Sequence, residues 1–376
     1  MGLAVYIHIP FCERKCNYCD FPSYPAAAYD IDAYLRALEL ELLRRSSDVR
    51  KSISSLFVGG GTPSILQESQ LTVLFGMVQA NFGLEPDAEV SIEANPGSCS
   101  AGKFALLREL GVNRLSLGVQ SLQSDLLRRL GRCHTPAEAI EAVHLARDAG
   151  FDNINLDFIA GVPGQDLAAW QATLQTALEL QPEHLSLYGL SIEPNTPFGS
   201  QWADGCLEVP DDEAQATMLE WSQHFLAEQG YGHYEISNYA LPGKACRHNQ
   251  VYWRNLPYLG FGAGAASYWQ EQRSTNLARV EEYVAAVNLG VVPVAEKEHL
   301  SVELQMAETL FLGLRLLAGV EKRDFARRFN LNIDDVYGEK IKVLQNKGLL
   351  EDSGKVVKLS KRGILLANEV FCEFLP

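Results

Sequence analysis

Three cysteines lie close together near the start of the chain. Cys12, Cys16 and Cys19 form a CxxxCxxC loop directly after the first strand that the sequence predicts. Three thiolates on a short loop can ligate three irons of a 4Fe–4S cluster. The fourth iron can be chelated by the amino and carboxylate groups of S-adenosylmethionine (SAM), whose carbon–sulfur bond is cleaved by electron transfer to give a 5′-deoxyadenosyl radical. We therefore predict an iron–sulfur protein that uses SAM.

Two other interpretations of this loop stay open from the residues alone. A zinc site would need a fourth ligand nearby. His8 is four residues upstream, but it alternates with Tyr6 in a predicted strand and need not face the loop. The three thiols could instead be unligated and buried. The other five of the eight cysteines are scattered, and we expect them to be small buried hydrophobes rather than a disulfide framework.

The first two-thirds of the chain repeats a short β-branched run, a turn and an amphipathic helix. Strands are predicted over residues 4–10, 55–59, 89–95, 114–120, 153–159 and 184–191. Helices are predicted near residues 30–45, 67–82, 100–110, 135–149, 167–180 and 212–229. Strands that alternate with helices imply parallel βαβ units with right-handed crossovers. The predicted fold class is α/β, either partly closed into a barrel or open as a doubly wound sheet.

Unusual residues fall where these strands end. They are the cysteine loop after the first strand, the run Gly59-Gly60-Gly61-Thr62 after the second, Glu93 in the third, Gln120 at the end of the fourth and Asp157 in the fifth. Carboxyl ends of parallel strands meet at one edge of a sheet or barrel. We therefore expect these residues to line one site.

The pattern changes after about residue 239. A stretch rich in glycine and aromatic residues covers residues 245–269, and from about residue 302 helices precede a hairpin around Ser353-Gly354. That order is typical of a small α+β, winged-helix-like module. We predict a barrel over residues 1–240, a connecting region over 241–300 and a C-terminal domain over 301–376.

The opening YIHIPFCERKCNYCDF resembles the start of the radical SAM proteins related to oxygen-independent coproporphyrinogen III oxidase (HemN). The similarity continues through GGGTPS, IEANP, RLSLGVQS, NINLDFIAGVPGQ and LSLYGLSIEPNTP, and so covers nearly the whole chain. The resemblance implies a partial (β/α)6 radical SAM barrel followed by a C-terminal HemN-type domain.

The same resemblance implies which residues contact SAM. Taken singly, a glycine triplet is typical of a turn, and a polar residue at a strand end is typical of a solvated or internally satisfied group. By similarity, the first SAM is contacted by Tyr6, Gly60 and Glu93. A second SAM, which is a feature of the oxidase branch, would be contacted by Tyr18, Gly61, Thr62, Gln120, Arg132, Asp157 and Ser191. Carboxylates can accept hydrogen bonds from ribose hydroxyls, and Arg132 can pair with a carboxylate.

A third motif is Cys246-Arg-His248-Asn249-Gln-Val-Tyr252-Trp253. As bare chemistry, an exposed histidine flanked by aromatic residues can be an axial haem ligand. The residues alone favour the alternative, a structural histidine that packs beside aromatics at a domain junction. However, HNxxYW is the pattern that marks the haem-chaperone (HemW) branch of this family, and the resemblance therefore favours His248 as a haem-binding residue.

Two further differences from the oxidases favour the same branch. The oxidases carry another cysteine two residues after the third ligand, where this chain has Phe21, and they have a long N-terminal extension, whereas this chain reaches Tyr6 almost immediately. The resemblance thus implies a protein that binds haem and delivers it to haem-requiring proteins, with the cluster and SAM as regulatory or assembly elements. The alternative is an enzyme that decarboxylates coproporphyrinogen propionates oxidatively.

Charge and composition limit the partners. The formal net charge is −15 at pH 7, which argues against nucleic-acid binding even though residues 321–362 carry 11 Lys and Arg against 7 Asp and Glu. The N-terminus lacks a basic stretch and a cleavage site, so we expect a cytoplasmic protein. The expected partners are haem, haem-requiring acceptor proteins and a reductant protein. A homodimer, and peripheral membrane association through the acceptors, are left open.

Overall fold

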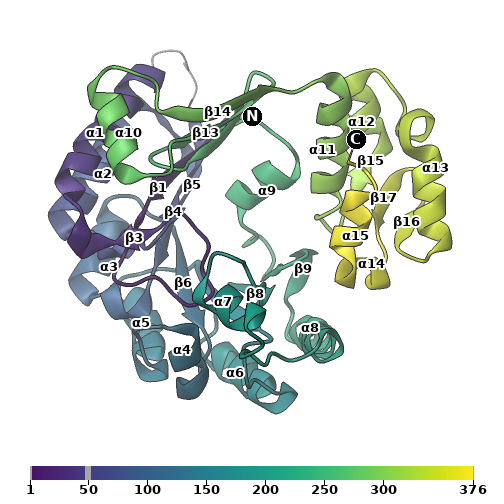
Figure 1. Cartoon of the computed structure of the whole chain (residues 1–376), viewed down its shortest axis with the longest axis horizontal. Coiled ribbons are helices and arrows are strands. Elements are labelled where there is room, and N and C mark those ends of the chain that lie inside the picture. Colours follow the sequence, from purple (N-terminus) through teal and green to yellow (C-terminus); the bar gives the residue numbers. More distant parts are fainter. Residues whose placement is uncertain (1, 47–51, 376) are drawn as a thin grey trace.

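The computed structural model describes residues 2–46 and 52–375 (Figure 1). Twelve strands of these residues form one large sheet, whose two edges are β14 and β9. In spatial order the strands are β14 (Val294–His299), β13 (Gln272–Asn276), β12 (Ala266–Trp269), β11 (Tyr258–Phe261), β1 (Leu3–Ile9), β4 (Ile53–Gly60), β5 (Leu84–Ala94), β6 (Arg114–Gln120), β7 (Ile154–Ala160), β8 (His184–Gly189), β10 (Asn238–Ala240) and β9 (Gly232–Glu235).

The six strands at the centre of this sheet are the six that the sequence predicts. β1, β4, β5, β6, β7 and β8 pair in this order, and every pair is parallel. The predicted bounds differ from the observed ones by a few residues, most at β5, which begins at Leu84 rather than residue 89. The prediction of parallel βαβ units is therefore confirmed.

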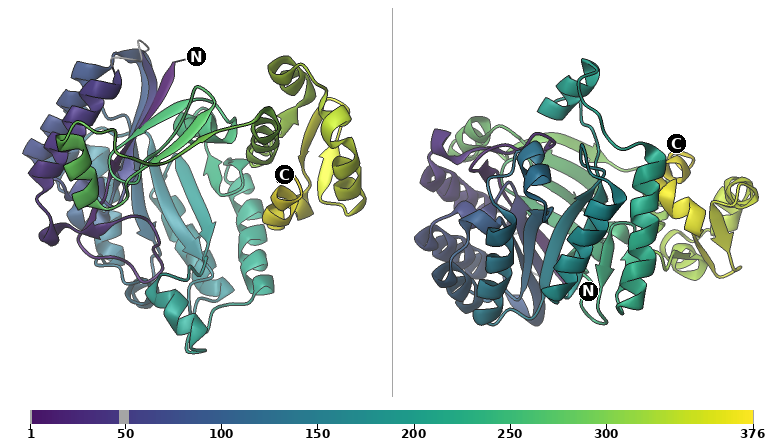
Figure 2. Two further views of the ribbon diagram at one scale, coloured as in Figure 1. Left: turned by 45° about the horizontal axis from the view of Figure 1, so that its top comes forward. Right: turned by 90° about the horizontal axis from the view of Figure 1, so that it is seen from below.

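Helices between these strands cover one face of the sheet (Figures 1 and 2). They are α1 (Ile31–Ser46), α2 (Glu68–Asn81), α3 (Ala101–Glu109), α4 (Ser124–Leu130), α5 (Pro136–Asp148) and α6 (Leu167–Glu179). Short 3-10 turns lie at Ala26–Ala28, Pro63–Ile65 and Pro96–Ser98. Three of the helices begin where a side chain accepts a backbone N–H of the first turn, namely at Ser100, Thr135 and Asp166. Such caps satisfy donors that a helix leaves free, and they fix where each helix starts.

The two faces of the central strands differ in polarity because side chains alternate along a strand. In β6, Leu115, Leu117 and Val119 are buried in the main hydrophobic core, together with residues of the covering helices. The alternate residues, such as Arg114 and Ser116, therefore lie on the opposite face. The concave inner face of the partial barrel is thus polar.

Residues 241–300, which we expected to connect two domains, largely extend the main sheet. β11 pairs in parallel with β1, and β12, β13 and β14 follow it in antiparallel order. α10 (Val280–Asn288) packs on α1, where the Arg44 side chain donates to the Val287 carbonyl at 2.6 Å. α9 (Arg247–Trp253) lies between the sheet and the C-terminal domain (Figure 1). The segment therefore forms part of the barrel's own structure.

The C-terminal domain has a separate hydrophobic core, formed by residues between Met306 and Phe374. Its elements are α11 (Val302–Gly313), β15 (Val320–Glu321), α12 (Lys322–Phe329), α13 (Ile333–Asn346), β16 (Leu350–Asp352), β17 (Val356–Leu359), α14 (Lys361–Leu365) and α15 (Ala367–Cys372). The predicted hairpin is β16–β17, and β15 adds a third strand that the sequence analysis missed. α14 and α15 follow the hairpin, and α15 packs against α11.

Two helices between β8 and β9 complete the barrel side. α7 (Pro197–Ala203) follows the loop after β8, and α8 (Asp212–Glu228) lies over β7 and β8. α8 is 17 residues long. Within residues 2–46 and 52–375, no helix combines the length and the apolar character needed to cross a membrane.

Candidate functional site

The cysteine loop is tied to the end of α4 by several hydrogen bonds. The Asn17 backbone N–H donates to the Leu130 carbonyl at 3.0 Å, and its side-chain amide donates to the Arg129 carbonyl at 2.8 Å. Arg14 donates to the Gly131 carbonyl at 2.8 Å. On its other side the loop begins in the two-residue strand β2 (Phe11–Cys12), which pairs with β3 (Tyr24–Pro25). The positions of the three thiols are therefore set by backbone contacts on both sides of the loop.

All three thiols are free and only partly buried. The Thr62 hydroxyl donates to Cys12 Sγ at 3.4 Å, and Arg132 Nη1 donates to Cys16 Sγ at 3.5 Å. Burial raises the pKa of Cys12 and of Cys19, and the neighbouring thiolates raise both pKa values further. These raised pKa values keep Cys12 and Cys19 as thiols in the absence of metal. Three thiols on one short loop next to a guanidinium are a suitable donor set for cationic iron, because metal binding favours the thiolate form.

The same side chains do not form a site for a single metal ion. Among the described residues, no three His, Cys, Asp or Glu side chains are placed so that they could hold one ion. A 4Fe–4S cluster does not require three side chains to reach the same ion, since each thiolate binds a different iron. His8 is also engaged elsewhere, with Nε2 3.0 Å from the Pro22 carbonyl and Nδ1 2.9 Å from the Tyr6 hydroxyl. The zinc interpretation therefore gains no support from His8.

The glycine run at the end of β4 is needed for a close backbone approach to the cysteine loop. The Gly61 N–H donates to the Ile9 carbonyl at 2.9 Å, and the Thr62 N–H donates to the Phe11 carbonyl at 2.7 Å. A Cβ on Gly61 would lie 2.6 Å from the Phe11 carbonyl oxygen, and Gly60 has a φ of +114°. Residues with a side chain would be strained at both positions. The run thereby brings the Thr62 hydroxyl to Cys12.

Two carboxyl groups predicted to contact SAM share the inner face of the sheet. Glu93 Oε2 accepts the Gly60 N–H at 2.9 Å, while Asp157 accepts from the Asn155 amide at 2.9 Å and the Ser116 hydroxyl at 3.1 Å. Burial raises the pKa of Glu93 to about 7, and the nearby Asp157 contributes to the increase. Burial also raises the pKa of Asp157. Both carboxyl groups have oxygen atoms that can accept hydrogen bonds, and a bound polar ligand would change their protonation.

Of the remaining predicted SAM contacts, Arg132, Gln120 and Tyr18 contact neighbouring residues, whereas Ser191 is exposed. Arg132 donates from Nη2 to the Asn95 side chain at 2.6 Å and to the Gly118 carbonyl at 2.7 Å, and its buried Nε has no hydrogen-bond partner. Gln120 ends β6 with a φ of +65°, and its amide approaches Gly118 together with Arg132. Tyr18 packs against an apolar cluster beside α4. Ser191 differs, because β8 ends at Gly189 and Ser191 is exposed beyond it.

His248 is buried rather than exposed, which is the arrangement of the structural histidine that the residues alone favour. Its exposed fraction is 0%, and both ring nitrogens have partners: Nδ1 lies 3.0 Å from the Ser55 hydroxyl and Nε2 lies 2.7 Å from the Tyr252 hydroxyl. Its ring stacks on Phe57. Burial, together with the nearby Arg114, lowers the pKa of His248 to about 3, so the imidazole is neutral.

The structure separates His248 from the cysteine loop. Ser55, its partner, lies near the start of β4, whereas Gly60 ends that strand next to the loop. Five residues of strand span about 17 Å. The two features therefore lie at different levels along β4, with Phe57 between them.

A polar network around His248 was missed by the sequence analysis. The carboxylate of Glu89 accepts the backbone N–H of Arg247 at 2.8 Å, and so holds the first turn of α9. His184 bridges the Asn155 side chain at 2.6 Å and the Tyr234 hydroxyl at 2.8 Å. A signal for this network was present, since polar residues alternate in Glu89-Ser91-Glu93, Arg114-Ser116 and Asn155-Asp157.

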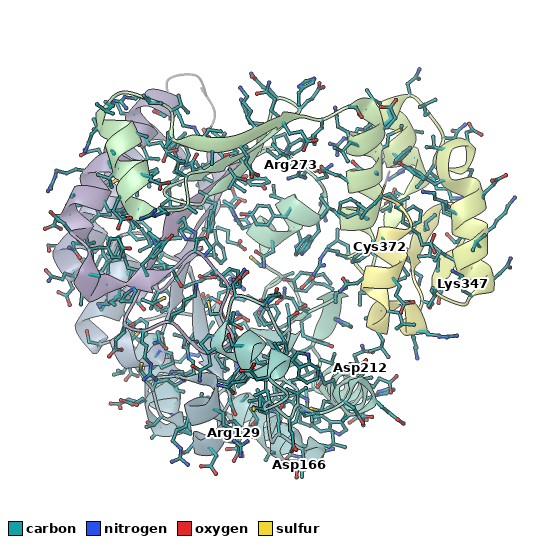
Figure 3. The ribbon with its side chains drawn as sticks, in the orientation of Figure 1. Arg129, Asp166, Asp212, Arg273, Lys347 and Cys372 are labelled. Atoms are coloured by element: carbon teal, nitrogen blue, oxygen red, sulfur yellow. The ribbon has the colours of Figure 1, made fainter. Side chains whose placement is uncertain are left out.

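The scattered cysteines do not behave as one class. Cys246 is buried, in line with expectation, and Cys99 is partly buried. Cys133, Cys206 and Cys372 are exposed, so the expectation of small buried hydrophobes is wrong for these three. Cys372 ends α15 in the C-terminal domain (Figure 3).

Family models match two regions of the chain. The model of the radical SAM superfamily matches residues 6–177, and the model of the HemN C-terminal domain matches residues 300–366. The first match includes the three cysteines, Glu93 and Asp157. The second begins just before α11 and ends just after α14.

Individual proteins are similar over nearly the full length. The chain is 40% identical over 376 residues to the haem chaperone HemW of Bacillus subtilis (strain 168), which covers 99% of both chains. It is 37% identical over 375 residues to the haem chaperone HemW of Lactococcus lactis, covering 99% of this chain and 97% of the other. The solved structure of coproporphyrinogen III oxidase (HemN) from Escherichia coli superposes with a TM-score of 0.87 at 25% identity, covering 99% of this chain and 90% of that chain. The predicted fold is thereby confirmed.

Proposed function

Because this chain belongs to the HemW branch of the radical SAM superfamily, we propose that it is a haem chaperone, which binds haem and transfers it to haem-requiring proteins. The observation that carries the proposal is the identity of 40% over the whole length of a haem chaperone. The cysteine loop and the HNxxYW helix α9 both lie within this match.

Membership of the superfamily implies a 4Fe–4S cluster and SAM. We propose that Cys12, Cys16 and Cys19 hold the cluster, which when bound supplies an electron to SAM. The half-buried free thiols and the orphaned Nε of Arg132 fit this assignment. The first SAM would contact Tyr6, Gly60 and Glu93. A second SAM would contact Tyr18, Gly61, Thr62, Gln120, Arg132, Asp157 and Ser191. Tyr6 and Glu93 would position the ligand on the polar inner face of the sheet.

For haem, we propose His248 as an iron ligand. A neutral imidazole is the form that binds a metal, and burial keeps His248 neutral. Its Nε2 contacts the Tyr252 hydroxyl at 2.7 Å, so coordination requires that this hydroxyl moves away. The phenol is on the same short helix, four residues later, and a rotation of its side chain would release the nitrogen.

The proposed function is tested on one preparation, reconstituted with iron and sulfide under anaerobic conditions. Haem titration should give a Soret band that weakens in His248→Ala, and the haem-loaded protein should activate an apo-haemoprotein. The same sample should form no protoporphyrinogen from coproporphyrinogen III with SAM and reductant. Failure of wild-type protein to bind haem, or to activate any acceptor, would contradict the proposal. Formation of protoporphyrinogen would favour the oxidase instead.

Partners follow from this function. We propose haem-requiring proteins as acceptors and a reductant protein as the electron donor to the cluster. Nucleic acid is not proposed, because the net charge of −15 opposes binding to phosphate.

A further inference from the structure

Two side chains from different parts of the barrel donate hydrogen bonds to thiols of the cysteine loop. Thr62, just after β4, has its hydroxyl 3.4 Å from Cys12 Sγ. Arg132, just after α4, has Nη1 3.5 Å from Cys16 Sγ. Each of these two thiols therefore has a side-chain donor of its own, one neutral and one charged.

Backbone contacts fix the place of the Thr62 hydroxyl. The Thr62 N–H donates to the carbonyl of Phe11 at 2.7 Å, and Phe11 directly precedes Cys12 in the chain. Threonine is branched at Cβ, which restricts the rotation of its side chain. Once the backbone is held, Oγ1 of Thr62 therefore stays beside the sulfur of Cys12.

The Arg132 guanidinium is placed by the end of α4 and by two acceptors. Gly131 closes the helix in a left-handed conformation with a φ of 77°, and the Arg132 N–H donates to a carbonyl of the last turn of α4 at 2.9 Å. Nη2 donates to the Asn95 side chain at 2.6 Å and to the Gly118 carbonyl at 2.7 Å. These contacts leave Nη1 beside Cys16.

Donors at cysteine sulfur affect how readily a bound iron–sulfur cluster accepts an electron. Reduction adds one negative charge to the cluster, and hydrogen bonds to the sulfurs help to set its potential. A donor or a positive charge beside the sulfur stabilises the reduced form more than the oxidised form. The interaction is stronger where water is partly excluded, and Arg132 is half-buried.

We propose that Thr62 and Arg132 raise the reduction potential of the cluster on the cysteine loop. The inference rests on the proposed function, which supplies the cluster. In this step the cluster gains the one electron that the reductant protein loses, and no bond of Thr62 or Arg132 forms or breaks. Both are positioning residues, because they act through the thiolates of Cys12 and Cys16.

Family similarity assigns the same two side chains to a second SAM. In the structure, the Thr62 hydroxyl and both terminal nitrogens of Arg132 already have acceptors, whereas Nε of Arg132 has no partner among the described residues. The contacts to sulfur therefore exist without SAM. Their effect on the cluster is measured in its absence.

The test is a redox titration of the full chain after anaerobic reconstitution, followed by the electron paramagnetic resonance signal of the reduced cluster. Arg132→Gln should lower the equilibrium constant of reduction about tenfold, which is about 59 mV for one electron. Thr62→Val should lower the potential in the same direction by a smaller amount, because a neutral donor is lost. Thr62→Ser keeps the hydroxyl and should restore a potential close to that of wild type.

Two exposed residues provide matched controls. Arg128→Gln removes the same charge at the same end of α4, but Arg128 is exposed and pairs with Asp125. Thr72→Val removes a hydroxyl that bonds to a carbonyl of its own helix α2. Both controls should keep the wild-type potential, since salt screens exposed charges and neither side chain contacts a sulfur.

The outcomes separate this inference from the proposed function. A wild-type potential in both Arg132→Gln and Thr62→Val, at full iron and sulfide content, overturns the inference while the cluster assignment stands. If Arg132→Gln loses its cluster, the comparison of Thr62→Val with Thr62→Ser decides, and equal potentials overturn the inference. If wild type itself retains no iron and sulfide, the cluster assignment is wrong and the inference falls with it.

Discussion

Glu89 Oε1 accepts the backbone N–H of His248 at 2.9 Å, which fixes the first turn of α9 to strand β5. The other carboxylate oxygen accepts the Arg247 N–H. Both donors belong to the start of a helix, where backbone N–H groups have no partner within the helix. The place of the histidine ring is therefore set by a strand more than 150 residues earlier in the chain.

Removing this carboxylate should loosen α9. Glu89→Ala removes the acceptor of the buried His248 N–H and of the half-buried Arg247 N–H, and we expect a loss of about 1–3 kcal/mol in the free energy of unfolding together with faster amide exchange over residues 246–253. Asp87→Asn is the control, because Asp87 pairs with the same Arg247 on the surface and should cost less than about 1 kcal/mol. Equal losses from both changes would show that Glu89 does not anchor the helix.

Tyr252 should compete with haem for His248. In Tyr252→Phe the Nε2 of His248 loses the hydroxyl that contacts it, and haem affinity should rise several-fold, which corresponds to about 1 kcal/mol for one hydrogen bond. Haem titration followed at the Soret band measures the change. Tyr337→Phe in the core of the C-terminal domain should leave affinity unchanged. Weaker binding in Tyr252→Phe would mean that the phenol helps to hold haem.

Glu93 should make stability depend on pH in the absence of SAM. Its pKa in the folded chain is about 7, above the ordinary 4.5, so the protonated form stabilises the fold. This contribution is present below pH 4.5 and is lost as the pH rises through 7. Between pH 5 and pH 8, urea unfolding should show wild type losing on the order of 2 kcal/mol relative to Glu93→Gln. Glu109→Gln, at an exposed site of α3, should remain parallel to wild type.

The three loop cysteines should be needed together. Replacement of Cys12, Cys16 or Cys19 by alanine removes one of three iron ligands, and each variant should retain little iron and sulfide after anaerobic reconstitution and desalting. Cys133→Ala changes an exposed cysteine close to Arg132 and should retain the full content. An undiminished cluster in any of the three loop variants would remove that residue from the ligand set.

The central fold could be predicted because its signals are local. Each βα unit combines a short apolar strand with an amphipathic helix, and the cysteine spacing is contained in eight residues. Strand pairing between neighbours in the chain follows from such units. The position of the cysteine loop at the carboxyl end of β1 was predictable for the same reason.

Long-range pairing could not be predicted in this way. β11 joins β1 across about 250 residues of chain, and nothing local in residues 258–261 specifies that partner. The burial of His248 likewise depends on Ser55, Phe57 and Glu89, which lie far away in the sequence. The motif showed that the histidine is distinctive, but only the folded arrangement shows that its ring nitrogens are already in use.

The edge strand β14 has a consequence for how the chain behaves in a crowded cell. Its residues after Val294 are exposed, and they include Glu296, Lys297 and Glu298 in succession. The unpaired backbone groups of an exposed edge strand can pair with a strand of another chain, and charged side chains make such pairing unfavourable. The charged edge of this large open sheet thus disfavours edge-to-edge pairing while the protein handles a poorly soluble cargo.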